Sequence, residues 1–503
     1  MIDPLHETHP DGIRWTTNNF AEAIPGAPTP LTWSIWRHAM TFAAWDNWIR
    51  LGVVSRAEAE REQAAGTPIV GIFHGHVAGN IDVMSRTVAR IPGYDPGAFE
   101  HDLFGLDPAD TPFKPTRQRW AAVAARAPIA LAGHGRRLRT LRTETETWWR
   151  AAVATELDRA GALALLGEAR ERFAVVLSAH SMQSQLSQAL FDRLGKVADA
   201  AGRPGLERQI VTGAAALEEV VLARDLWALS RKQLDRDAFL ARHGFHGPAE
   251  AELLSRSWRE DPSPLDPVVA AFAAEPDDRS PSAMTARQVA SGREAAAELL
   301  AAVGPTKRPG TRSLIALARR HVPRREIGKN GFLMAVDVAR HAARQLGDVC
   351  FHTYEELAAG ATVDTSARRA TRDTYLDVAL PAVWTGQPTP AQATPGEGVI
   401  RGAPVSPGVV EGTARVVLDP LDCDGPVGED EVLVARTTDP SWVTLFLTAG
   451  ALVIDIGGPL SHGAIVAREL GVPCVIGTGD GTRRIRTGDR LRVDGHEGTV
   501  EIL

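Results

Sequence analysis

The sequence predicts an α+β multidomain protein in which a large, mostly helical region precedes a small β-rich domain. Segments rich in Ala, Leu, Arg and Glu, with apolar residues at helical spacing, fill the first part of the chain. Residues 386–397 are rich in Pro, Gly, Thr and Ala, which is typical of a linker. Beyond the linker, short strands alternate with turns. We therefore expect a helical region over 1–385 and a second domain over 398–503.

Amphipathic spacing predicts several helices in the first region, and Pro128 and Gly133 are expected to separate the first two. The expected helices span residues 117–126, 138–160, 173–201, 280–303 and 311–321. His180 is expected to cap a helix start. An aromatic stripe near helical spacing indicates core rather than a binding site. Its members are Trp33, Trp36, Met40, Trp45 and Trp48.

Composition narrows the class of protein. A chain of 503 residues can hold two or three domains. The net charge of −7 argues against nucleic acid or an anionic membrane as partner. The three cysteines, Cys350, Cys423 and Cys474, show no CxxC spacing, which favours a reducing cytoplasm. The sequence shows neither a signal-peptide pattern nor an apolar run of about 20 residues, so we expect a cytoplasmic protein.

One histidine lies where a strand meets a helix. Residues 451–456 form a short apolar run typical of a buried strand, and Gly457-Gly458 follows as a turn. Ser461 is a good N-cap, and residues 463–470 have helical spacing. His462 is therefore expected in the first helical turn.

That position suits phosphoryl transfer. Free N–H groups and the positive end of the helix dipole favour a bound dianion. An imidazole is largely unprotonated near neutral pH and is a good nucleophile. A histidine that merely packs in a capped turn fits the spacing of His462 equally well, so the local pattern leaves both interpretations open.

Residues 457–475 resemble the phosphohistidine signature of the phosphoenolpyruvate-utilising enzymes, which include rifampin phosphotransferase and phosphoenolpyruvate synthase. The match includes Gly457, Gly458, Ser461, His462 and the Ala-Ile-Val-Ala-Arg-Glu run that contains Arg468. The resemblance implies a C-terminal β/β/α swivelling domain in which His462 carries phosphate and its loop residues support the phosphoryl group. Leu460 replaces the Thr that many members have, so regulation through that Thr is not available.

A second part of the signature lies upstream. Thr437-Thr438, at the end of an expected strand over 431–436, is similar to the family's TTDPxW turn, which faces the histidine loop. The resemblance implies that Thr437 and Thr438 donate hydrogen bonds to a phosphoryl oxygen. Capping of the following helix is the structural alternative.

Weaker family-like patches in the first region imply that it binds the phosphoryl acceptor. Asn80 is a candidate for orienting a ligand, and His243 and Glu250 are acid/base candidates. Arg325 and Lys329, four apart on a helix, are expected to lie on one face and clamp the transferring group. A structural turn Asn, surface polar groups and a solvated basic face are the respective alternatives. His76 and His246 replace the arginines that these patches commonly have.

The donor site is expected on another protein. The sequence contains no GxxxxGK[ST] loop, and the helical and β-rich regions account for all of its length. The resemblance then implies a separate ATP-grasp-type partner that supplies ATP and Mg, with no cofactor bound tightly by this chain. The histidine takes the β-phosphoryl group in that chemistry, and AMP and phosphate leave. The acceptor is expected to be a small molecule with a hydroxyl group.

Four alternatives stay open at this stage. Phosphoenolpyruvate is a second possible donor. Elimination of the activated hydroxyl would make the protein a dehydratase, and a homologue without transfer would be a binding or regulatory module. A metal site at His74 and His76 has the His-x-His spacing but lacks a convincing third ligand. We therefore predict a phosphotransferase subunit with no metal of its own.

Overall fold

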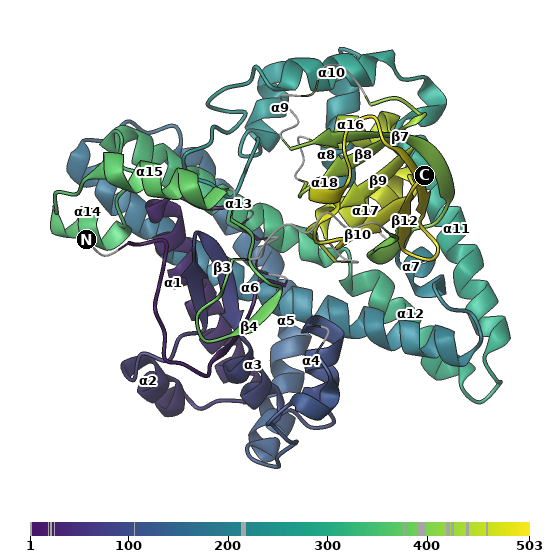
Figure 1. Cartoon of the computed structure of the whole chain (residues 1–503), viewed down its shortest axis with the longest axis horizontal. Coiled ribbons are helices and arrows are strands. Elements are labelled where there is room, and N and C mark those ends of the chain that lie inside the picture. The colour runs from purple at the N-terminus through teal and green to yellow at the C-terminus, as the bar shows by residue number, and fades with distance from the viewer. Residues whose placement is uncertain are drawn as a thin grey trace. The chain divides into compact units, whose positions relative to one another are not determined.

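The computed structural model describes the chain except for a set of short gaps. The residues outside the description are 1–2, 19, 21–22, 25, 105, 213–217, 377, 391–397, 419–422, 424–426, 439–441 and 459–460. The chain forms two compact units (Figure 1). Unit 1 comprises residues 1–182, 251–254 and 328–393, and unit 2 comprises 183–250, 255–327 and 394–503.

Unit 1 is mostly helical and contains one small sheet. Its helices are α1 (Pro30–Leu51), α2 (Arg56–Ala64), α3 (Ile81–Val88), α4 (Pro96–Phe104), η1 (Pro108–Asp110), α5 (Trp120–Ala152), α14 (Tyr354–Ala359) and α15 (Thr365–Leu376). The sheet has the order β2-β3-β1-β4, with strands β1 (Arg14–Thr16), β2 (Val70–Phe73), β3 (His76–Asn80) and β4 (Val383–Thr385). Two further helices, α6 (Arg159–Ala200) and α13 (Arg324–Leu346), run from one unit into the other.

The aromatic stripe of α1 belongs largely to the core, as predicted. Trp33, Trp36 and Trp45 are buried. The ring of Trp36 meets that of Phe173, on α6, edge-on at 4.7 Å between centroids. Each ring of this size removes a large apolar area from water, which explains why one helix can organise the unit.

The predicted break at Pro128 and Gly133 is wrong. Helix α5 runs through both residues without interruption. Pro128 and Gly133 are exposed, so the proline ring faces solvent, while Val123 and Leu138 are buried. An interior proline costs about 3 kcal/mol, and burial of the opposite face offsets that cost.

His180 does not cap a helix start. It lies inside α6, which begins at Arg159 rather than near residue 173. Its ring meets that of Phe332, on α13, at 5.1 Å between centroids. The sequence prediction failed because Ala- and Leu-rich helix formers continue upstream and carry the helix past the expected start.

Unit 2 combines a helical layer with the C-terminal domain. Its helices are α7 (Leu206–Val211), α8 (Glu218–Ser230), α9 (Arg236–His243), α10 (Leu265–Ala274), η2 (Asp277–Arg279), α11 (Pro281–Ala302), α12 (Arg308–His321), α16 (Val443–Thr448), α17 (His462–Leu470) and α18 (Gly481–Arg484). The helices expected over 280–303 and 311–321 correspond to α11 and α12 and are confirmed.

The C-terminal sheet has eight strands in the order β5-β12-β11-β7-β8-β9-β10-β6. They are β5 (Ile400–Arg401), β6 (Ala403–Ser406), β7 (Val409–Val417), β8 (Glu431–Ala435), β9 (Ala451–Ile454), β10 (Cys474–Ile476), β11 (Arg490–Asp494) and β12 (Thr499–Ile502). Strands β7 to β10 are parallel neighbours and the other pairings are antiparallel. The expected α+β multidomain class is confirmed.

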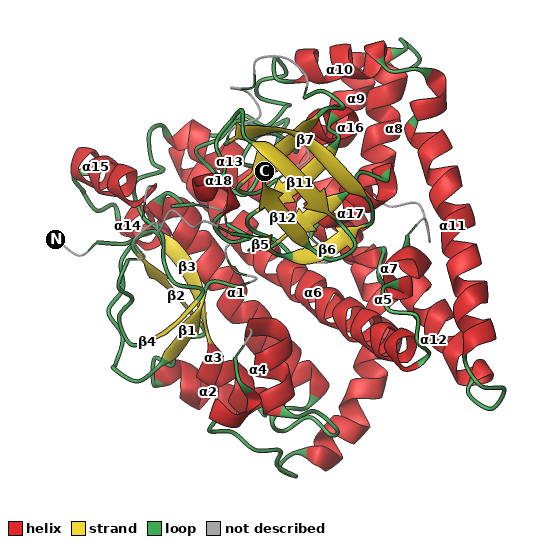
Figure 2. Ribbon diagram, turned by 45° about the vertical axis from the view of Figure 1, so that its right-hand side comes forward, coloured by secondary structure: helices red, strands yellow, loops and turns green. Residues whose placement is uncertain are grey.

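Both faces of the sheet are buried along β8, β9 and β10, as is usual for parallel strands. Alternate residues such as Leu433 and Leu452 face a core shared with α8, α10, α16 and α17. Their neighbours, such as Val432 and Val453, face a second core closed by β11 and β12. Figure 2 shows the helices of the first core grouped beside the sheet.

The expected linker begins at a residue bonded to unit 1 and is followed by a strand of unit 2. The N–H of Gly386 donates to the carbonyl of Ile13 in unit 1. Ile400, in β5 of unit 2, pairs with Val500. Residues 391–397, the second half of the linker, lie outside the described residues. The boundaries 1–385, 386–397 and 398–503 stay a prediction.

Candidate functional site

Three loops meet at one edge of the C-terminal sheet. Strands β8, β9 and β10 are parallel, so the segments that follow them leave the sheet on the same side. These segments are residues 436–438, 455–461 and 477–480. The carboxyl edge of parallel strands is where ligands bind in α/β sheets, because loops from several strands converge there.

The histidine loop follows the predicted strand–turn–helix pattern. Ser461 has an extended backbone and its side chain accepts a hydrogen bond from the N–H of Ala464. His462 is the first residue of α17, and Gly471 ends that helix in the left-handed conformation. The structure describes the backbone of His462 and not its side chain. The backbone position is nevertheless the first turn of a helix, where N–H groups and the dipole favour a dianion.

Gly457 is required for the shape of this loop. Its φ is +146°, which side-chain-bearing residues rarely adopt. A Cβ there would lie 2.6 Å from Cδ1 of Ile476 and 2.9 Å from Oγ of Ser461. Gly458, by contrast, has open space around the position of a Cβ. Only the first residue of the predicted Gly-Gly turn is therefore constrained by packing.

Thr438 lies against the first turn of the histidine helix. A Cβ built on Gly463 would lie 2.7 Å from Oγ1 of Thr438. The neighbouring backbone is fixed because the N–H of Ile456 donates to the carbonyl of Arg436 at 2.9 Å. Capping of α16 is not the role of Thr437 or Thr438, because the N-cap residue of that helix is Trp442. The hydroxyl of Thr438 is thus placed beside the residue that follows His462.

Asp455 joins the loop after β9 to the segment after β10, and sequence reasoning missed it. Its carboxylate accepts hydrogen bonds from Oγ1 of Thr478 at 2.6 Å and from the N–H of Thr482 at 3.0 Å. The hydroxyl of Thr482 donates to it as well. Asp455 is buried. A charged residue at the end of an otherwise apolar strand was the signal that could have identified it, because buried carboxylates need several donors.

Arg468 lies near the C-terminal end of α17, the helix that begins at His462. It follows His462 by six residues, which corresponds to about 9 Å along a helix axis. It is buried, and burial lowers the pKa of its guanidinium to about 10. Repulsion from Arg208 and Arg325 acts in the same direction. The supporting role of Arg468 stays a prediction, and the charge of Arg325 acts on that end of α17.

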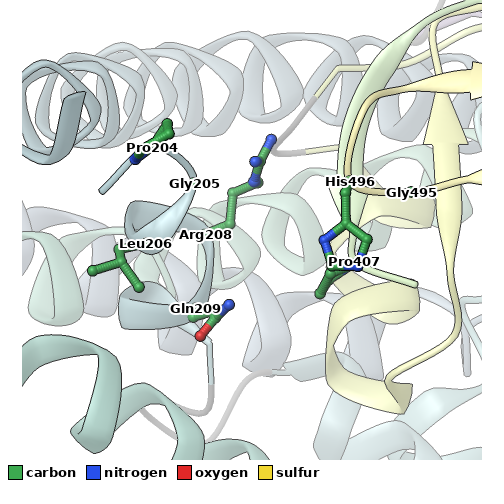
Figure 3. Close-up of a pocket in the computed structure, with 8 residues that line it drawn as sticks. All are labelled: Pro204, Gly205, Leu206, Arg208, Gln209, Pro407, Gly495 and His496. Atoms are coloured by element: carbon green, nitrogen blue, oxygen red, sulfur yellow. The ribbon is translucent and has the colours of Figure 1, made fainter. Parts of the chain in front are cut away.

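A pocket at the opposite edge of the sheet has no part in this loop. It is lined by Pro204, Gly205, Leu206, Arg208, Gln209, Pro407, Gly495 and His496 (Figure 3). A Cβ on Gly495 would lie 3.2 Å from the backbone nitrogen of Cys474, the first residue of β10. The pocket therefore lies at the amino edge, whereas the histidine loop lies at the carboxyl edge.

Two of the candidates in the first region lie in unit 1. Asn80 is the N-cap of α3, where its side chain accepts from the N–H of Val83 and donates to the carbonyl of Pro68. Both ends of the amide are thus used within the fold, which favours the structural alternative. Lys329 lies on α13, four residues after Arg325 as expected, but Arg325 belongs to unit 2.

His243 and Glu250 belong to one buried cluster in unit 2. Nε2 of His243 lies 2.8 Å from Oδ2 of Asp225, and Nδ1 of His246 lies 2.9 Å from Oε2 of Glu250. His243, His246 and Glu250 are all buried. Burial is the main cause that lowers the pKa of His243 to about 4, with the charge of Asp225 opposing it. Sequence reasoning missed Asp225, which is 18 residues from His243 and carries no motif.

The described part of the chain was also compared with the geometry of a metal site and of a membrane-spanning helix. No group of three or more His, Cys, Asp or Glu side chains there is arranged to hold a metal ion. His74 meets His6, with 4.3 Å between ring centroids. None of the described helices is long and apolar enough to cross a membrane.

Comparison with known proteins gives two domain matches. Residues 427–498 match the model described as the mobile domain of PEP-utilising enzymes. The C-terminal domain is thus similar to the mobile domain of that family. Residues 145–326 match the fourth domain of rifampicin phosphotransferase. The resemblance seen in the sequence is confirmed for both regions.

Relatives agree with these matches. A rifampicin phosphotransferase of Streptomyces sviceus is 30% identical over 393 residues, which is 71% of this chain and 43% of the relative. A rifampicin phosphotransferase of Bacillus subtilis is 32% identical over 53% of this chain and 34% of the relative. A phosphoenolpyruvate synthase of Aeropyrum pernix is 42% identical over 24% of this chain and 15% of the relative. The chain thus spans less than half the length of these relatives.

Proposed function

We propose that this protein is a phosphotransferase in which His462 is transiently phosphorylated and passes phosphate to a hydroxyl group of a small organic molecule. The placement of His462 as the first residue of α17, behind the Ser461 cap, supports this most directly. The match of residues 427–498 to the mobile domain of PEP-utilising enzymes gives that position its chemistry. Helix N–H groups and the hydroxyl of Thr438 stabilise the added dianion.

The transfer needs two positions of the C-terminal domain. In one position His462 meets the donor, and in the other it meets the acceptor. We assign residues 386–397 as the tether, because their Pro, Gly, Thr and Ala content is typical of a linker. The acceptor binds within the first 385 residues, where the match to the fourth domain of rifampicin phosphotransferase lies. Arg325 and Lys329 are the cations that we assign to the incoming phosphate.

The donor is ATP with Mg, bound by a separate ATP-grasp-type protein. His462 takes the β-phosphoryl group, and AMP and phosphate leave. Phosphoenolpyruvate is the second candidate donor, because one of the relatives is a phosphoenolpyruvate synthase.

Labelling tests this proposal. The purified protein is incubated in an extract of its source cell with β-labelled or γ-labelled ATP, beside His462→Ala and His496→Ala. His496 is exposed on the β11–β12 turn and serves as the control. We expect acid-labile label from the β-position in the wild type and in His496→Ala, and none in His462→Ala. Equal labelling of all three proteins would refute the proposal. If ATP leaves no label on the wild type, labelled phosphoenolpyruvate is tested in the same way, and label from it would replace ATP as donor.

A further inference from the structure

The buried cluster in unit 2 contains two histidines, each held by a carboxylate. Asp225 lies on α8, His243 ends α9, and His246 and Glu250 lie in the segment that follows. The two rings are nearly parallel, with 27° between their planes and 6.4 Å between centroids. Three buried titratable groups with a partly buried carboxylate beside them are costly to desolvate, and such an arrangement is typical of chemistry rather than of a turn.

The segment is held rigidly by its backbone and by aromatic neighbours. The N–H of Trp258 donates to the carbonyl of His246 at 2.7 Å, and the N–H of Arg259 donates to the carbonyl of Gly244 at 2.8 Å. The ring of Trp258 lies 5.9 Å from that of His246. Trp258 is fully buried. The imidazole of His246 therefore has a fixed position before any substrate arrives.

Each carboxylate also fixes one tautomer. When His246 is neutral, its Nδ1–H donates to Glu250, which leaves a lone pair on Nε2. This is the relation of carboxylate, imidazole and hydroxyl by which an enzyme prepares a general base. Glu250 then stabilises the imidazolium that forms when Nε2 takes a proton.

His243 plays a different part because it stays neutral. Its pKa is lowered to about 4, chiefly by burial, with Asp225 opposing the shift and His246 and Arg242 contributing to it. Arg242 also contacts Asp225, at 3.3 Å. A neutral neighbour does not repel the positive charge that forms on His246. Two histidines in one cluster thus receive two roles from their surroundings.

We propose that His246 is the general base that deprotonates the acceptor hydroxyl, with Glu250, His243 and Asp225 as its positioning residues. The inference rests on the proposed function. The hydroxyl oxygen forms a bond to phosphorus as its proton passes to Nε2 of His246. The N–P bond of phosphorylated His462 breaks, and the electron pair stays on the leaving ring, which takes a proton from water. His246 then returns its proton to solvent, so no net proton is gained or lost.

The place of the cluster in unit 2 fits this step. Phe239 lies 5.0 Å from the ring of His243 and, with Trp258, belongs to the apolar core that α8 and α10 share with α16 and α17. The helix that begins at His462 is thus packed on the same core.

The test measures phosphorylation of His462 (loading) separately from transfer of that phosphate to a hydroxyl group (discharge). The full-length protein is phosphorylated chemically with phosphoramidate, and loading at His462 is measured by mass spectrometry. Discharge is then followed by ³¹P NMR with 1,2-propanediol as the hydroxyl probe, between pH 5 and pH 9. The variants are His246→Gln, His243→Gln and Asp225→Asn, with His496→Gln as the control. Asp225 is the most exposed member of the cluster, with 18% of its side chain accessible, so its substitution is least disruptive to folding.

We expect every variant to load like the wild type. Transfer to the diol should fall about 100-fold in His246→Gln, the lower end of the range for loss of a general base, and its rise with pH should disappear. Asp225→Asn should lower the rate less and keep the rise with pH. Wild-type discharge rates and pH profiles in His246→Gln would overturn the inference. A wild type that cannot be loaded at His462 would refute the proposed function itself, which the loading step reveals separately.

Discussion

The depressed pKa of His243 predicts how stability depends on pH. The folded protein keeps this histidine neutral down to about pH 4, whereas an unfolded chain protonates it near pH 6.5. Between those values the unfolded state binds more protons, so lowering the pH destabilises the fold. The shift corresponds to about 3 kcal/mol over the whole window and about 2 kcal/mol between pH 7 and pH 4.5.

Urea unfolding of the wild type and His243→Gln at pH 7 and pH 4.5 measures this effect. Tryptophan fluorescence is a suitable signal, because Trp258 and Trp442 are buried in unit 2. The variant should be less stable than the wild type at pH 7 but lose about 2 kcal/mol less on acidification. His496→Gln controls for the loss of one histidine. Equal losses in the wild type and His243→Gln would refute the assignment of the pH effect to this residue.

Two further substitutions test the histidine loop. In Asp455→Asn only one oxygen is left to accept the hydrogen bonds that two carboxylate oxygens now accept from Thr478 and its neighbours. The free energy of unfolding should therefore fall by about 2 kcal/mol, and phosphorylation of His462 by phosphoramidate should slow. An unchanged urea midpoint and an unchanged rate of phosphorylation would contradict this prediction. Gly463→Ala places a Cβ 2.7 Å from Oγ1 of Thr438 and should impair loading, whereas Gly310→Ala, in a helix with open space, should be neutral or slightly stabilising in the same assays. Equal loading in both glycine variants would show that the close packing at Thr438 is not needed.

Local sequence signals predicted the histidine loop well. The strand, the Ser461 cap, the start of α17 and the Gly471 stop depend on interactions within a few residues, and the structure has each of them. The boundaries of long helices were predicted less well. Pro128 was expected to end a helix because its local cost is clear, but tertiary burial on the other face decides the outcome. The packing partners that bury this face come from distant parts of the chain, so the local sequence around Pro128 does not predict them.

The roles of charged side chains were harder to predict for the same reason. Arg468 matched the family signature, yet helix geometry places it two turns away from His462. Arg325 and Lys329 have the expected spacing on α13, but spacing alone did not indicate that Arg325 approaches Arg468. Periodicity fixes which residues share a face, and only the packing of the helices decides what that face meets.

The cluster around His246 shows where motif reasoning gains most from a structure. The motif singled out His243 and Glu250 as acid/base candidates, but these two do not pair with each other. Asp225, which lies 18 residues before His243, orients that ring, and Glu250 orients His246 instead. Because a carboxylate that fixes a tautomer determines which nitrogen can take a proton, the partner is as informative as the histidine. The pairing therefore turns two isolated candidates into one base with a defined basic atom, Nε2 of His246, and that atom is what the discharge experiment tests.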